Sequence, residues 1–161
     1  MGHPLPPLGR RGEGWVVAQS VLGLAVVLTG LLGPGWPEGR RLALAVTGVL
    51  IGAAGLALFM LGVRALGSSL TPFPRPADGA TLREHGVYRR VRHPIYGGVL
   101  LLALGWSLAF SPLALGATAL LWILLDLKSR HEESMLVERY PAYEAYRERV
   151  RGRFLPRLFG T

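Results

Sequence analysis

The sequence contains no cysteine, no asparagine, one glutamine (Gln19) and one lysine (Lys128). The absence of cysteine excludes disulfide bonds, thiolate catalysis and cysteine-based zinc sites. Only 17% of the 161 residues are charged and half are apolar, which is little charge for a soluble globular domain. The length suits one domain covering residues 1–161, without a separate soluble module.

Three long stretches have no charged residue: 15–32, 42–63 and 95–125. Helices of the first two lengths match the roughly 30 Å hydrocarbon core of a bilayer. The third stretch is too long for one straight span, and Ser111-Pro112 interrupts it, because proline disfavours a helix interior. We therefore predict an all-α polytopic membrane protein with about four transmembrane helices, at 15–32, 42–63, 95–110 and 113–127. The last two form a hairpin of two short arms, and a cytoplasmic amphipathic helix follows toward the C-terminus.

The formal net charge of +8 would indicate nucleic-acid binding in a soluble protein. In a membrane protein, basic residues instead gather in cytoplasmic loops. All basic residues except Arg40 and Arg41 fall before the first span, between the second and third, or after the fourth. These regions share one side if all four segments cross. We predict that this side, with both termini and the active site, faces the cytoplasm (of the inner membrane in a bacterium), and that no nucleic acid is bound.

Small residues line one face of the second span. Ala45, Gly48, Gly52 and Gly55 would lie together on a helix, and small residues let helices approach closely in lipid. The face is suited to packing within the chain or against a second copy, so a homo-oligomer is one expected assembly.

Two polar segments, residues 80–98 and 128–156, flank the hairpin. Because the hairpin returns to the same side, its first residues should meet the start of the second segment at the membrane surface. The meeting would join a histidine, tyrosines, arginines and two glutamates to a helix N-terminus, which favours anions. Taken singly, each has a structural explanation: Pro94 begins a helix, Glu132 and Glu133 balance nearby arginines, and tyrosines anchor at the interface.

Neither a metal site nor a soluble-type nucleotide site is indicated. His85, His93, His131 and Glu132 form no HExxH motif and no close histidine pair at helical spacing. The sequence also lacks the glycine-rich motifs of dinucleotide and P-loop sites. We predict no metal.

Together the two polar segments form a paired motif. The first reads Leu82-x3-Gly86-Val87-Tyr88-x3-Arg92-His93-Pro94-x-Tyr96-Gly97, and the second reads Glu132-Glu133-x2-Leu136-x3-Tyr140-Pro141-x-Tyr143-x2-Tyr146. This pair around a hairpin resembles the isoprenylcysteine carboxyl methyltransferase and phospholipid methyltransferase superfamily. The resemblance covers residues 70–156, and the first two spans carry no signature. It implies methyl transfer from S-adenosyl-L-methionine to a lipid or lipophilic small molecule that enters from the bilayer among membrane lipids.

The resemblance also implies the site residues. The cofactor pocket would be formed by Ala80, Thr81, Leu82, Arg83, Tyr88, Arg92, His93, Pro94, Ile95, Tyr96, Glu132 and Glu133. Glu132 would hold the cofactor's ammonium group. The catalytic residue that orients a substrate carboxylate would be Lys128, or Arg130 by a shift of register. The family has arginine at the position of Lys128, and lysine lacks the two-pronged donor geometry of arginine, so this departure weighs against a carboxylate substrate.

Two other functions compete with this hypothesis. A membrane reductase for sterol-like lipids, using NADPH, shares an HPxY-type segment, but the glutamate pair and the short chain favour the methyltransferase. A non-catalytic membrane protein of the same fold is the second alternative, and the presence of all the motif residues argues against it. The substrate and its acceptor atom (O, N or S) stay open, among prenylated proteins, phospholipid amines and small isoprenoids or thiols.

Overall fold

The computed structural model describes residues 8–9, 12–67, 70–71, 73 and 82–156. These residues form helices and connecting segments, with no strand among them. The helices are α1 (Glu13–Leu32), α2 (Glu38–Leu66), the short 3-10 helix η2 (Gly86–Arg89), α3 (Pro94–Phe110), α4 (Pro112–Arg139) and α5 (Tyr143–Arg149). The predicted all-α class is confirmed.

Three of the described helices, α1, α2 and α4, are long and apolar enough to cross a membrane. The fourth apolar helix, α3, has 17 residues, or about 26 Å at the α-helical rise. These helices make the chain a polytopic membrane protein. The predicted short second arm of the hairpin was wrong, because α4 has 28 residues and continues to Arg139. Residues 128–139 contain neither glycine nor proline, so the apolar helix continues into a charged extension instead of ending near residue 127.

The hairpin turns at the predicted position. Ser111 has extended backbone angles between α3 and α4, and its Oγ accepts a hydrogen bond from the backbone N–H of Leu113 at 3.2 Å. Pro112 follows at the first helical position, where its missing donor has no cost. The two residues that interrupt the apolar stretch therefore cap the second arm.

Glycines set the contact between α2 and α3. Gly48, Gly55 and Gly62 are buried on α2, at seven-residue spacing, and they face α3. A Cβ atom at Gly55 would lie 2.7 Å from the Leu101 Cβ and 2.8 Å from the Leu102 backbone nitrogen. A side chain there would therefore separate the helices. Of the small-residue face predicted from the sequence, Gly48 and Gly55 are covered by α3 of the same chain, whereas an added Cβ at Gly52 would meet no atom within 4 Å among the described residues.

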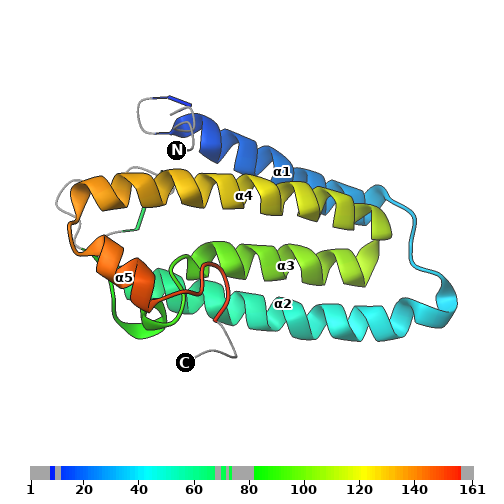
Figure 1. Cartoon of the computed structure of the whole chain (residues 1–161). Helices are drawn as coiled ribbons and strands as arrows, with labels where there is room; N and C mark the ends of the chain where they lie inside the picture. Colours follow the sequence, from blue (N-terminus) through cyan, green and yellow to red (C-terminus); the bar gives the residue numbers. More distant parts are fainter. Residues whose placement is uncertain (1–7, 10–11, 68–69, 72, 74–81, 157–161) are drawn as a thin grey trace.

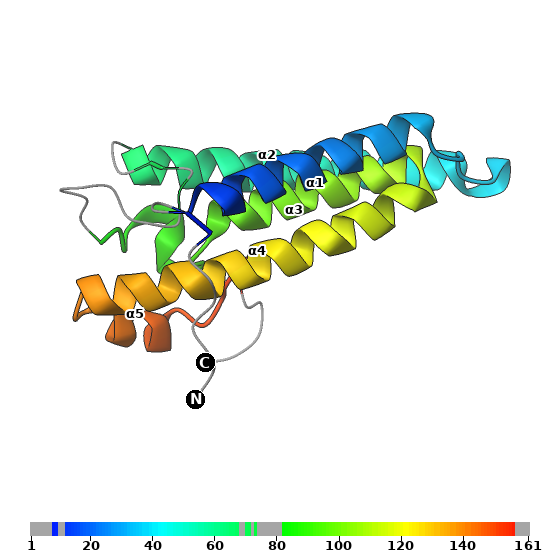
Figure 2. The same ribbon diagram turned by 90° about the horizontal axis from the view of Figure 1, so that it is seen from above.

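The helices form a bundle in which α3 lies between α2 and α4 (Figures 1 and 2). Helix α1 packs against α4 and also contacts α3. Its connection to α2 is held by Trp36, whose Nε1 donates to the Ser107 carbonyl at 3.2 Å. At the opposite end of the bundle, α1 and α3 begin, α2 and α4 end, and α5 lies beside them (Figure 1). This end contains the polar segments of the sequence.

Candidate functional site

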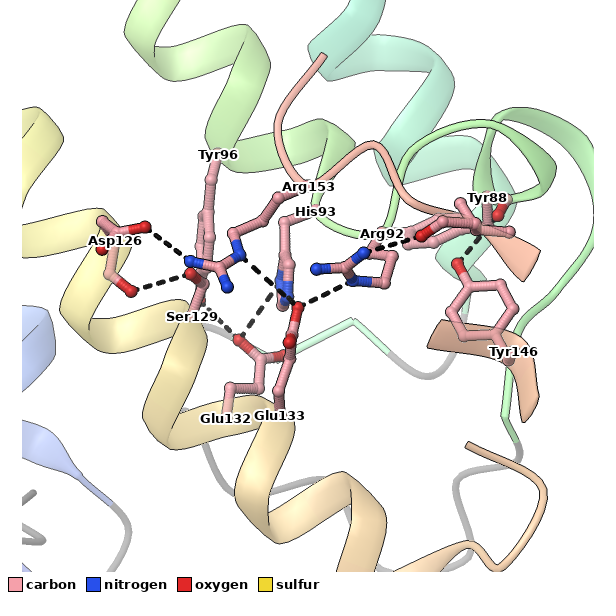
Figure 3. Close-up of polar contacts among 11 residues, drawn as sticks. Tyr88, Arg92, His93, Tyr96, Asp126, Ser129, Glu132, Glu133, Tyr146 and Arg153 are labelled. Atoms are coloured by element: carbon pink, nitrogen blue, oxygen red, sulfur yellow. Dashed lines mark hydrogen bonds and ion pairs between the residues drawn. The ribbon is translucent and has the colours of Figure 1, made fainter. Parts of the chain in front are cut away.

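The first turn of α3 meets the charged extension of α4 (Figure 3). The Tyr96 hydroxyl donates to Glu132 Oε2 at 2.9 Å, and His93 Nε2 lies 3.0 Å from Glu133 Oε1. The His93 and Tyr96 rings are stacked, with centroids 5.4 Å apart and planes 2° from parallel. The structure thus joins the two polar segments as the hairpin predicted.

The two neighbouring glutamates have different surroundings. The Glu133 side chain is 6% exposed and lies 2.9 Å from Arg92 Nε, with which it forms an ion pair, and 3.9 Å from Arg153 Nε. The Glu132 side chain is 25% exposed, and it lines a cavity that Glu133 does not reach. Glu133 therefore stabilises the fold through its ion pairs, while the Glu132 carboxylate faces the cavity.

Arg92 joins α3 to the C-terminal segment. Besides its bond to Glu133, its guanidinium donates to the Val150 carbonyl at 2.6 Å. The backbone N–H groups of Arg92 and His93 donate to the carbonyls of Gly152 and Arg153, at 2.9 and 2.8 Å. The C-terminal segment is therefore bonded along the start of α3, and much of the Arg92 side chain is engaged within the protein.

Close packing fixes the same segment from a second side. The Phe154 carbonyl occupies the space that a Cβ atom at Gly97 would need. Arg153 also donates to Asp126 Oδ1 on α4, at 2.6 Å. Gly97 of the sequence motif is thus explained by the close approach of this backbone, which no side chain at that position would allow.

Tyrosines surround the polar part of the site. The Tyr146 hydroxyl donates to the Tyr88 carbonyl at 2.8 Å. Burial raises the pKa of the Tyr88 phenol above its ordinary value, and the nearby Glu132 carboxylate and Tyr146 raise it further. Burial likewise raises the pKa of Tyr146. Both phenols therefore stay protonated over the physiological pH range, as neutral aromatic walls that can donate hydrogen bonds.

A cavity of about 350 Å³ connects these groups with the apolar helices. Its polar lining comprises Gln19, Thr71, Arg83, Arg92, His93, Lys128 and Glu132. Its aromatic and apolar lining includes Phe59, Val63, Ile95, Val99, Leu136 and the five tyrosines of the chain. Among the described residues, no group of three or more His, Cys, Asp or Glu side chains is placed to hold a metal ion.

Most of the residues predicted for the site line this cavity. They are Leu82, Arg83, Tyr88, Arg92, His93, Ile95, Tyr96, Lys128 and Glu132. Pro94 is buried at the helix start and Glu133 lies in the ion-pair network, both outside the lining. Ala80 and Thr81 lie outside the described residues.

The two candidates for the substrate-orienting base lie in different places. Lys128 is 1% exposed, and its ammonium group lies 5.1 Å from the centroid of the Tyr96 ring. The Arg130 side chain is 60% exposed and pairs with Asp126 at 2.8 Å. Arg130 does not line the cavity, so the structure brings only Lys128 to the site.

The sequence motifs missed contributions from the first two helices. Gln19 of α1 and Phe59 and Val63 of α2 line the cavity, although neither span carries a signature. Gln19 could have been found as the only carboxamide in the chain, in an otherwise apolar span, because polar groups in such segments are costly. Phe59 and Val63 have no comparable signal, since apolar residues are ordinary in a span.

Comparison with known proteins identifies the family of this chain. A search of curated proteins finds no match to the chain. The family model described as phospholipid methyltransferase matches residues 43–143, more than half of the chain and every helix from α2 to α4. The chain belongs to the phospholipid methyltransferase family of membrane methyltransferases.

Proposed function

We propose that this protein transfers a methyl group from S-adenosyl-L-methionine to a lipophilic substrate dissolved in the bilayer. The observation that carries the proposal is the Glu132 carboxylate, bonded to Tyr96 and open to a cavity that continues between apolar helices. A polar end and an apolar end in one cavity suit the meeting of a water-soluble cofactor with a lipid-soluble acceptor.

The residues fit the amino-acid end of this cofactor, which carries an ammonium and a carboxylate. Glu132 supplies an anion for the ammonium. Arg83 lines the cavity, and among the described residues its Nε is a buried donor without a hydrogen-bond partner. A buried unsatisfied donor is costly, and a carboxylate would satisfy it. Arg83 is therefore a better candidate for the carboxylate than Arg92, whose guanidinium is bonded to Glu133 and Val150.

The remaining walls would serve positioning and the exclusion of water. When bound, S-adenosylmethionine supplies a methyl group activated by a sulfonium charge. Tyrosine faces attract such cations, by up to about 2 kcal/mol when desolvated, and Tyr88 and Tyr96 line the cavity. The chain needs no nucleophile of its own, because methyl transfer depends mainly on alignment in a dry site. The substrate atom and the O-, N- or S-methyl class stay open in this proposal.

Cofactor binding by the detergent-solubilised chain tests the proposal. We expect S-adenosylhomocysteine, the demethylated product, to bind in calorimetry, and Glu132→Gln to weaken it about tenfold or more, because a charge-assisted hydrogen bond is lost. Glu138→Gln is the matched control, since Glu138 is exposed on the same helix and should leave the affinity unchanged.

The same assay separates the competing functions. Failure of folded wild-type protein to bind S-adenosylhomocysteine would contradict the proposal. Stabilisation by NADPH without stabilisation by S-adenosylhomocysteine would favour the reductase. A lack of affinity for both would favour a non-catalytic protein.

A further inference from the structure

Gln19 and Lys128 form a polar pair where the cavity enters the apolar part of the bundle. The Lys128 ammonium donates to Gln19 Oε1 at 2.7 Å, and both residues line the cavity. Lys128 lies one turn of α4 before Glu132, on the side of the apolar span. The pair is therefore placed beyond the Glu132 end, toward the lipid-soluble acceptor.

The chemistry of the pair fixes which way the glutamine amide faces. A lysine ammonium only donates hydrogen bonds, so the Gln19 oxygen must face Lys128. The amide nitrogen of Gln19, which carries two N–H donors, must then face away from Lys128. The pair contributes donors from two helices, the ammonium from α4 and the amide from α1, beside apolar walls that include Phe59 and Val99.

Helix α1 is held in place on both sides of Gln19. Trp15 stacks on His131 of α4, with ring centroids 6.0 Å apart. Farther along α1, the Trp106 indole of α3 occupies the space that a Cβ atom at Gly30 would need. Helix α1 also lies alongside α4 (Figure 1). Gln19 is thus fixed beside Lys128. Its hydrogen bond holds the Lys128 ammonium in the cavity, whereas a long lysine side chain would otherwise extend toward water.

We propose that Gln19 is a specificity-determining residue, which with Lys128 binds an anionic oxygen of the substrate, a carboxylate or a phosphate, through two donor groups. A buried ammonium beside an amide donor selects a charged acceptor, because charge-assisted hydrogen bonds are about twice as strong as neutral ones. A lone lysine lacks the two-pronged geometry of arginine, and the Gln19 amide supplies the second donor. The proposal rests on the proposed function for the site. The family match begins at residue 43 and does not include Gln19.

Amphiphiles with one common chain and different head groups test this proposal. Oleate, oleyl phosphate and oleyl alcohol would be titrated against the full chain in a neutral detergent at mildly alkaline pH. We expect the wild type to bind at least one anionic amphiphile about tenfold or more tightly than the alcohol. Gln19→Met, which keeps the length and removes the amide, should reduce this preference severalfold while the affinity for the alcohol changes little.

Matched variants separate a specific role from a structural one. Ser20→Ala is the control, because Ser20 is exposed and its hydroxyl bonds to the Val16 carbonyl of its own helix; it should keep the preference. Lys128→Met should abolish the preference. A structural defect would weaken binding of all three amphiphiles equally, whereas the proposal requires a change in head-group selectivity.

The outcomes are distinct. Preference for only one of the two anions supports the proposal and identifies the group as carboxylate or phosphate. Equal binding of alcohol and anions by the wild type would overturn it, and so would a Gln19→Met protein that keeps the full preference. Binding of S-adenosylhomocysteine is measured on the same samples. If the proposed function fails, S-adenosylhomocysteine will not bind, whatever the head-group preference.

Discussion

Adjacent residues of like charge have different surroundings at this site, and the difference comes from the helix. Successive residues on an α-helix point about 100° apart, so Glu132 faces the cavity while Glu133 faces His93 and its ion-pair partner Arg92. The sequence motif contains both glutamates without distinguishing them. The two roles can be assigned only from the positions of α3 and of the C-terminal segment, and neither glutamate determines those positions.

The two cavity-lining arginines should respond differently to substitution. Arg83→Met should weaken S-adenosylhomocysteine binding about tenfold or more with little loss of stability, because it removes a donor that has no hydrogen-bond partner among the described residues. Arg92→Met should instead destabilise the fold, by about 3 kcal/mol, because it removes the closest ion-pair partner of the buried Glu133 carboxylate, at 2.9 Å, and leaves Arg153 at 3.9 Å. Calorimetry measures the first effect, and unfolding by increasing SDS in mixed micelles measures the second.

A third variant controls for the loss of an arginine. Arg89 is exposed in η2, and Arg89→Met should change neither property. A folded Arg92→Met protein that loses affinity, together with an Arg83→Met protein that keeps it, would place the cofactor carboxylate at Arg92 instead.

Among the helices, α4 links the membrane to the site in one rigid piece. Its apolar part packs in the bundle through Leu121 and Leu125, and its extension carries Lys128 and Glu132. The sequence predicted the turn at Ser111-Pro112, because proline disfavours a helix interior. It did not predict the length of the helix, because the end of an apolar stretch does not mark the end of a helix. The absence of glycine and proline from residues 128–139 was the better indicator.

The return of the C-terminal segment to α3 was not predictable. It depends on backbone hydrogen bonds from Arg92 and His93 to the carbonyls of Gly152 and Arg153. Backbone groups are the same at every position, so such long-range bonds leave no pattern in the sequence. Gly97 marks the contact from the other side, but a glycine alone does not indicate which segment approaches it.

The contact between α2 and α3 allows a matched test on one helix. Gly55→Ala should destabilise the protein by about 1–3 kcal/mol, because the added Cβ would lie 2.7 Å from the Leu101 Cβ. Gly52→Ala, three residues earlier on α2, should be neutral or slightly stabilising, because no atom of the described residues lies within 4 Å of its added Cβ and alanine favours a helix. Unfolding in SDS mixed micelles compares the two. Equal destabilisation by both variants would contradict a contact face made by glycines at seven-residue spacing.

Across the whole molecule, the cavity is assembled from segments that the sequence motifs only partly include. Hydrophobic stretches and a break in one of them were enough to predict that the two polar segments meet. They were not enough to predict that α1 closes the cavity with Gln19, because the packing of one apolar helix on another depends on shape. The motif-bearing half therefore indicated the polar end of the site, and the structure was needed for the end near the lipid.

The orientation in the membrane is a further property of the whole molecule, and the absence of cysteine makes it directly testable. Gly35 lies in the connection between α1 and α2, and Ser134 is exposed on the charged extension of α4. If basic residues mark the cytoplasmic side, a membrane-impermeant maleimide should label Gly35→Cys in intact cells. It should label Ser134→Cys only after the membrane is opened.

Each labelling variant carries a single thiol, so the wild-type chain is an unreactive control. An added Cβ at Gly35 would meet no atom within 4 Å in the part of the chain that the structure describes. The Ser134 hydroxyl bonds to the His131 carbonyl of its own helix, so both variants should fold normally. Labelling of Ser134→Cys in intact cells, with Gly35→Cys protected, would reverse the orientation. The cofactor site would then face away from the compartment in which S-adenosylmethionine is made, so this result would also argue against the proposed methyl transfer.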